Sequence, residues 1–161
     1  MRIGIVGATG AVGQETIQVL KDRGFPVTEL HLFASERSAG KTTETAFGTI
    51  TIEPFSVEAA RGMDIVFLAV SGDFAKEYAP QIAAEGGAVV IDNSSAFRYD
   101  DAVPLVVPEI NGRRALGQKL IANPNCTTAI LLMALAPLHE AFGVKRAIVS
   151  TYQAASGAGA E

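Results

Sequence analysis

Short apolar runs alternate with amphipathic stretches along most of the chain. Five runs have the length and composition of buried strands: residues 3–6, 30–34, 64–70, 88–91 and 120–122. Residues 11–23 and 74–85 carry apolar side chains at helical spacing, and glycines follow both segments. The alternation predicts an α/β fold, with a Rossmann-like, mostly parallel sheet and helices on both faces.

Three further segments complete the pattern. Glycines interrupt the polar, threonine-rich residues 40–48, which indicates a small hairpin or an extended excursion. Residues 127–142 are apolar nearly all round, so we expect a buried helix, which Pro137 can kink. Residues 146–153 are strand-like, and the sequence shows no later element to cover them. We therefore interpret the chain as ending early in a second domain.

Composition narrows the classes of function. The 161 residues are 48% hydrophobic and 19% charged, which is typical of a folded chain with one well-buried core. No apolar run approaches the roughly 20 residues needed to cross a bilayer, so we expect no membrane partner. The net charge of −4 gives no support for nucleic-acid binding and favours a small-molecule substrate.

The single cysteine excludes an intrachain disulfide. The start of the chain also lacks the apolar core of a secretory signal. Both features predict a protein of the reducing cytoplasm. We expect no resident metal.

A glycine-rich loop joins the first predicted strand to the first helix. Glycines at this place permit a tight turn, close approach of a pyrophosphate and close packing of the helix. Free N–H groups and the helix dipole then face the phosphate. We expect the cofactor to contact Gly7, Thr9, Gly10, Ala11, Val12 and Gly13. The alternative is a tight strand-to-helix turn without a ligand.

The end of the second predicted strand indicates which cofactor binds. Sites that prefer NAD usually place a carboxylate there for the ribose hydroxyls, but the strand ends at Ala34 without one. Ser35, Arg37 and Ser38 can instead donate hydrogen bonds to a 2′-phosphate, which favours NADP. The alternative is a solvated loop in which Arg37 pairs with Glu36.

Cys126 lies between a predicted strand and the start of a predicted helix. The helix dipole there favours the thiolate, and the sheet rim gives a substrate access, so we interpret Cys126 as a nucleophile. The alternative is an inert buried thiol. Neither His31 nor His139 is well placed as its base, so we expect the base beyond Glu161.

Arg98 follows the predicted strand at residues 88–91. Its guanidinium can bind an anionic substrate as a rigid fork. A surface ion pair with Asp100 or Asp101 is the alternative.

Six segments together resemble aspartate-semialdehyde dehydrogenase over the whole chain: GATGAVG, ASERSAGK, DNSSAFR, VPLVVPEIN, NPNCTTAI and STYQAASGAG. The resemblance implies NADP-dependent reduction of L-aspartyl-4-phosphate to aspartate semialdehyde and phosphate, and the reverse reaction. It places this step in lysine, methionine and threonine biosynthesis and implies a homodimer or a higher oligomer.

The resemblance also assigns roles to residues. It implies Cys126 as the acyl-thioester nucleophile, Gln153 as a substrate-positioning residue, and Arg98 and Asn125 as substrate or phosphate binders. Ser156 and Gly157 would approach the nicotinamide half of NADP. The implied domains are an NADP-binding domain at residues 1–126 and the start of a catalytic and dimerisation domain at residues 127–161.

Other assignments fit less well. N-acetylglutamyl-phosphate reductase uses related chemistry, but the NPNCTT and ASERSAGK segments are closer to the aspartate enzyme. The histidine and the carboxylate-binding arginine that the family carries later have no counterpart here, so we expect this chain alone to be inactive. The alternative function is a non-catalytic NADP-binding module, or a fragment that needs a partner segment.

Overall fold

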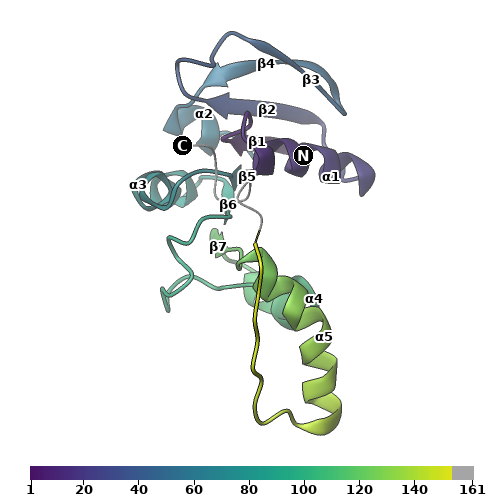
Figure 1. The fold of residues 1–161 in the computed structure, drawn as a ribbon. Helices are drawn as coiled ribbons and strands as arrows, with labels where there is room; N and C mark the ends of the chain where they lie inside the picture. The colour runs from purple at the N-terminus through teal and green to yellow at the C-terminus, as the bar shows by residue number, and fades with distance from the viewer. Residues whose placement is uncertain (154–161) are drawn as a thin grey trace.

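The structure, a computed structural model, describes residues 1–153 and contains a seven-stranded sheet in the order β3-β4-β2-β1-β5-β6-β7 (Figure 1). The strands are β1 (Arg2–Val6), β2 (Glu29–Ala34), β3 (Thr42–Thr45), β4 (Gly48–Pro54), β5 (Ile65–Leu68), β6 (Val89–Asp92) and β7 (Leu120–Ala122). The helices are α1 (Ala11–Asp22), α2 (Val57–Arg61), α3 (Gly72–Ala83), α4 (Pro108–Asn111), the 3-10 helix η1 (Gly112–Ala115) and α5 (Cys126–Phe142).

The strand pairing is parallel from β4 through β2, β1, β5 and β6 to β7. Among the described strands only β3 is antiparallel, and it pairs with β4 as the predicted hairpin. The carboxyl ends of the parallel strands therefore share one edge, where ligands of such sheets bind. The predicted Rossmann-like fold is confirmed.

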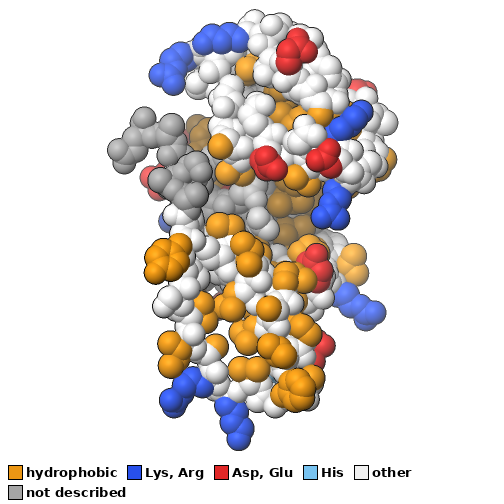
Figure 2. All heavy atoms as spheres, turned by 45° about the vertical axis from the view of Figure 1, so that its right-hand side comes forward, with side chains coloured by type: hydrophobic (Ala, Val, Ile, Leu, Met, Phe, Trp, Pro, Cys, Tyr) orange, Lys and Arg blue, Asp and Glu red, His pale blue; other side chains and the backbone are white. Residues whose placement is uncertain are grey.

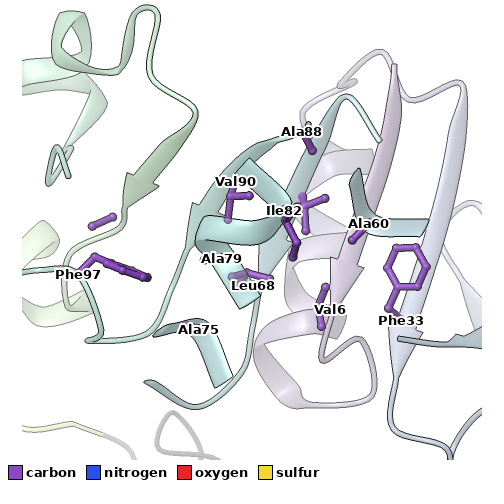
Figure 3. Close-up of a cluster of buried hydrophobic side chains, with 12 residues drawn as sticks. Val6, Phe33, Ala60, Leu68, Ala75, Ala79, Ile82, Ala88, Val90 and Phe97 are labelled. Atoms are coloured by element: carbon purple, nitrogen blue, oxygen red, sulfur yellow. The ribbon is translucent and has the colours of Figure 1, made fainter. Parts of the chain in front are cut away.

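Alternate residues of each strand pack on opposite faces of the sheet. In β1, Ile3 and Ile5 join a buried cluster with Ile17 and Leu20 of α1. Val6 points to the other face, where the larger cluster gathers side chains of α2 and α3 (Figure 3). That cluster contains Val6, Phe33, Ala60, Val66, Leu68, Ala75, Ala79, Ile82, Ala88, Val90, Phe97 and Ala122. The two faces of the sheet thus have separate cores.

The α1 face is less completely covered than the α3 face. Phe67 of β5 and Ile91 of β6 are only partly buried there, and Val12 and Val19 of α1 are 41% and 45% exposed. These side chains line a groove of about 560 Å³. Parallel sheets are normally covered on both faces. Here the groove leaves part of the α1 face uncovered.

The five predicted buried strands are confirmed as β1, β2, β5, β6 and β7, and the helices α1 and α3 are confirmed as well. The sequence analysis did not anticipate α2, α4 or η1, because four or five residues are too few to show a helical period. The start of α2 carried one usable signal. Ser56 precedes it, and its side chain accepts a hydrogen bond from the N–H of Ala59.

The prediction that residues 127–142 form a buried helix is correct for the helix and wrong for its burial. The structure forms α5 over Cys126–Phe142, continuous through Pro137, but none of its residues is buried. Figure 1 shows α5 extending away from the sheet, and no described segment covers its outer face. Among the described residues, no helix is long and apolar enough to cross a bilayer.

The prediction of a strand at residues 146–153 is wrong. The segment runs extended beside α5 and is assigned to no sheet (Figure 1). Its side chains are exposed, with Ile148 at 91% and Tyr152 at 97%. β-propensity requires a neighbouring strand for its hydrogen bonds, and the described residues offer none here. Figure 2 shows apolar side chains gathered over this lower part of the molecule.

Gly13 supplies a test of the packing between α1 and the sheet. A Cβ atom at Gly13 would lie 2.5 Å from the carbonyl oxygen of Gly7 and 2.8 Å from the Cα of Ala8. We expect Gly13→Ala to lower the free energy of unfolding by about 1–3 kcal/mol, as overpacking does, although helix propensity alone favours alanine by about 1 kcal/mol.

The matched control is Gly10→Ala, because a Cβ there has its nearest contact at 3.4 Å. Urea unfolding of both variants provides the measurement. Equal stabilities for Gly13→Ala and Gly10→Ala would contradict the close-contact interpretation.

Candidate functional site

The loop after β1 turns so tightly that it excludes a side chain at Gly7. This glycine has φ of +83°, and a Cβ atom there would collide with the carbonyl oxygen of Ala69. Its N–H donates to the carbonyl oxygen of Phe33 at 3.0 Å, which fixes the loop against the end of β2. The glycine at this position is therefore required by geometry.

Helix α1 begins with its N–H groups facing the same edge. The N-cap is Gly10, which has no side chain that could bond to the first N–H groups of the helix. Thr9, Gly10, Ala11 and Val12 are all exposed, while Gly13 is buried against the loop. An exposed helix start with unfilled N–H donors can bind a phosphate group.

A cavity of about 540 Å³ lies beside this loop, within the usual size range of small-molecule sites. It is lined by Val6, Gly7, Thr9, Ala34, Ser35, Glu36, Phe55, Val70, Ser71 and Phe74. The lining combines the glycine loop, the end of β2 and the start of α3. The residues present thus fit an extended ligand that carries a phosphate at the α1 end.

The segment after β2 forms a tight turn. The carbonyl oxygen of Ser35 accepts from the N–H groups of Ser38 at 2.8 Å and Ala39 at 3.1 Å. Ser35 and Arg37 are exposed and Ser38 is half-buried. Ser35 and Glu36 line the cavity, whereas Arg37 and Ser38 lie outside its lining. Arg37 can therefore reach a ligand only from the turn beside the cavity.

Cys126 is the first residue of α5, and its side chain is exposed. Asn125 caps the helix, since its Oδ1 accepts from the N–H of Thr127 at 3.0 Å and from the Thr127 hydroxyl at 2.6 Å. The other end of the same amide, Nδ2, donates to Oε1 of Gln153 at 3.0 Å. The fold thus brings Asn125, Cys126 and Gln153 to one place.

Arg98 bonds to main-chain groups at the ends of two strands. Its Nε donates to the carbonyl oxygen of Asn123 at 3.0 Å and its Nη2 to that of Asn93 at 2.9 Å. Within the described residues it forms no ion pair with Asp100 or Asp101. The guanidinium is thereby held at the functional edge, with N–H groups left over for an anion.

Asp92 is a structural residue of this edge that the sequence analysis overlooked. The carboxylate is fully buried and accepts from the N–H of Ser94 at 2.9 Å and from its hydroxyl at 2.8 Å. The Ser94 oxygen in turn accepts from the N–H of Ala96 at 3.1 Å. These bonds shape the turn that leads to Arg98. The signal in the sequence was an acidic residue ending an apolar strand, with a serine two residues later.

The two histidines lie away from the thiol. Nδ1 of His31 is 2.8 Å from Oε1 of Glu53, in a contact between β2 and β4. His139 lies in the last turn of α5, whose first residue is Cys126, so about 20 Å of helix separates them. Ser156 and Gly157, predicted to contact the cofactor, lie outside the described residues.

Residues 2–118 match the family described as semialdehyde dehydrogenase, NAD binding domain. The aspartate-semialdehyde dehydrogenase of Synechocystis sp. is 50% identical over 161 residues, which cover 99% of this chain and 47% of that protein. The chain therefore spans about half the length of the curated relatives it matches.

Two solved structures support the same relationship. Aspartate semialdehyde dehydrogenase II of Vibrio cholerae, complexed with ASA, matches with a TM-score of 0.80 and 44% identity, covering 89% of this chain and 48% of that one. The aspartate semialdehyde dehydrogenase of Candida albicans, solved with NADP, matches with a TM-score of 0.67 and 29% identity, over 89% of this chain and 48% of that one.

The exposure of Cys126 can be tested by alkylation. We expect iodoacetamide to modify the folded chain without denaturant, because the sulfur is exposed at the first residue of α5. The chain has one cysteine, so the mass increase reports this residue alone. A thiol that reacts only after urea is added would show that Cys126 is inaccessible in the folded chain.

Proposed function

Because the chain belongs to the semialdehyde dehydrogenase family through its NAD-binding domain, we propose that it forms the cofactor-binding half of an NADP-dependent aspartate-semialdehyde dehydrogenase. The reaction is reduction of L-aspartyl-4-phosphate to aspartate semialdehyde and phosphate, and its reverse. One observation carries the proposal: an exposed cysteine at a helix start, joined through Asn125 to Gln153, in a chain that also carries the complete glycine loop.

The chain's own groups suit the acyl-transfer step. The Cys126 thiolate attacks the acyl carbon of the substrate, and the phosphate leaves as the thioester forms. Asn125 and Arg98 supply N–H donors for the phosphate oxygens, and Gln153 orients the substrate beside the sulfur. NADPH held by the glycine loop would supply the hydride that reduces the thioester.

Preference for NADP over NAD rests on the turn after β2. The strand ends at Ala34 without a carboxylate for the ribose hydroxyls, and the nearest one, Glu36, follows two residues later and lines the cavity. Arg37 is exposed on the turn, where its guanidinium can bind a 2′-phosphate. The Candida albicans relative was solved with NADP. These features support NADP as the cofactor of this chain.

We also propose that residues 127–161 begin a second domain that completes the site and forms a homodimer or a higher oligomer. The apolar side chains of α5 support this, since Ile130 is 72% and Phe142 81% exposed in the chain alone. A mostly apolar helix is stable in water only when another surface covers it. The reducing cytoplasm is the compartment that keeps a nucleophilic thiol in its active form.

A second candidate function is a cofactor-binding module without turnover. It is favoured by the family match over residues 2–118, which is to an NAD binding domain. The two candidates predict different behaviour when the other half is supplied, and the second experiment below separates them.

Titration calorimetry tests the cofactor. We expect NADPH to bind more tightly than NADH, and Arg37→Ala to remove most of the difference by weakening NADPH roughly tenfold or more, since a hydrogen bond to a charged group contributes about 1.5–3 kcal/mol. Arg114→Ala is the matched control, because Arg114 is also exposed and lies on η1, away from the turn after β2. Equal affinities for NADPH and NADH in the unmodified chain would contradict the assignment of NADP as the preferred cofactor.

NADPH formation from aspartate semialdehyde, NADP and phosphate tests the reaction. We expect negligible turnover by the 161-residue chain alone, since general acid–base catalysis typically contributes about 10²–10⁴-fold and neither histidine is near the thiol. Turnover should appear when the carboxyl-terminal half of the Vibrio cholerae relative is added, and Cys126→Ser should abolish it. Cofactor binding without restored turnover would favour the non-catalytic module.

A further inference from the structure

The ends of β6 and β7 are joined by a bond between two side-chain amides. Asn93 directly follows β6, and Asn123 directly follows β7. Nδ2 of Asn123 donates to Oδ1 of Asn93 at 2.8 Å. The main chain runs in register beside it, because the N–H of Asn123 donates to the carbonyl oxygen of Asp92 at 2.8 Å. The bond therefore lies where the two strands leave the sheet.

Arg98 hydrogen-bonds to the main chain at the same two strand ends. Its two hydrogen bonds end on the carbonyl oxygens of Asn93 and Asn123, the residues whose side chains are bonded to each other. The N–H of Asn93 also donates to the carbonyl oxygen of Leu68, at the end of β5, at 3.1 Å. Asn123 is thus held by its side chain, its N–H and its carbonyl oxygen.

Only Pro124 and Asn125 separate this junction from Cys126. Pro124 is buried, and its ring fixes φ while restricting the backbone of Asn123 before it. Asn125 is held by its cap bonds to Thr127. A connection so short and so constrained transmits the position of Asn123 directly to the sulfur-bearing residue.

We propose that Asn123 is a positioning residue, which acts through its side-chain bond to Asn93 to set the place of the Cys126 thiol. The proposal rests on the proposed function, in which Cys126 is the nucleophile. It concerns the geometry of the thiol and assigns neither amide to contact with the substrate.

The surroundings strengthen this bond. Asn93 and Asn123 are both half-buried and line the groove beside Val12, Phe67 and Ile91. Water screens a hydrogen bond less where the neighbouring side chains are apolar, and an unpaired amide there is costly. The pair is therefore expected to be formed most of the time in the folded chain.

The test is a double-mutant cycle on the rate constant for alkylation of Cys126 by iodoacetamide. We expect Asn123→Ala and Asn93→Ala each to lower it by roughly 2- to 10-fold, the range that corresponds to the net contribution of one hydrogen bond. The double variant should fall no further, because either change alone removes the bond. Unchanged single variants, or multiplying effects in the double variant, would overturn the proposal.

Two controls separate positioning from general loss of structure. Asn111 makes comparable bonds elsewhere, to the N–H of Val107 and the carbonyl oxygen of Leu105. Asn111→Ala should lower the urea midpoint and leave the alkylation rate within about twofold of the parent, the lower bound of a one-bond effect. Asn93→Asp keeps the acceptor oxygen and should also retain the parent rate. A rate that follows stability in every variant, or a loss in Asn93→Asp equal to that in Asn93→Ala, would contradict the proposal.

Alkylation is independent of turnover, so the two proposals can fail separately. If NADPH formation is never restored but the double-mutant cycle behaves as expected, the amide pair positions the thiol and the proposed reaction is wrong. If turnover is restored while the cycle shows no effect, the reaction stands and Asn123 has no positioning role.

Discussion

The parallel pairing of six strands determines where the loops of the candidate site lie. These strands are β4, β2, β1, β5, β6 and β7. Because all six strands run in one direction, the segments that leave their carboxyl ends emerge along a single edge. The glycine loop, the turn after β2, Arg98 and Cys126 come from distant parts of the sequence and meet there for this reason. A single antiparallel strand within this series would have moved one of them to the opposite edge.

The part of this edge near the glycine loop and the part near Cys126 differ in how closely their segments pack on the sheet. The side near the glycine loop is formed by segments that are packed on the sheet, with Gly7 hydrogen-bonded to Phe33 and the cavity lined by Phe55 and Phe74. The cysteine side depends on α5 and on Gln153, both of which lie mostly exposed. Within the described residues, the side chains beside the glycine loop are therefore more fully packed than those around Cys126.

The sequence predicted what depends on local pattern. The five buried strands, α1, α3 and the helix start at Cys126 followed from periodicity and glycine placement. The edge on which Cys126 lies followed from the alternation of strands and helices. The environment of α5 and of residues 146–153 could not be predicted in this way, because burial and pairing depend on what else is present in space. Likewise, the bond between Asn93 and Asn123 joins residues 30 positions apart, and nothing in either local segment indicates it.

The close contact between Gly13 and the turn at Gly7 makes the length of the loop a fixed quantity. Gly13, Ile17 and Leu20 lie on one face of α1, the face that packs on the turn and the sheet. Each residue of an α-helix turns it by about 100°, so an extra residue absorbed into the first turn would rotate all three residues away from that packing. If α1 kept this face toward the sheet, the extra residue would instead have to bulge out of the loop between Gly7 and Gly13. Substitutions can therefore accumulate on the exposed surface of this loop, whereas an insertion or a deletion would disrupt the packing of α1 on the sheet.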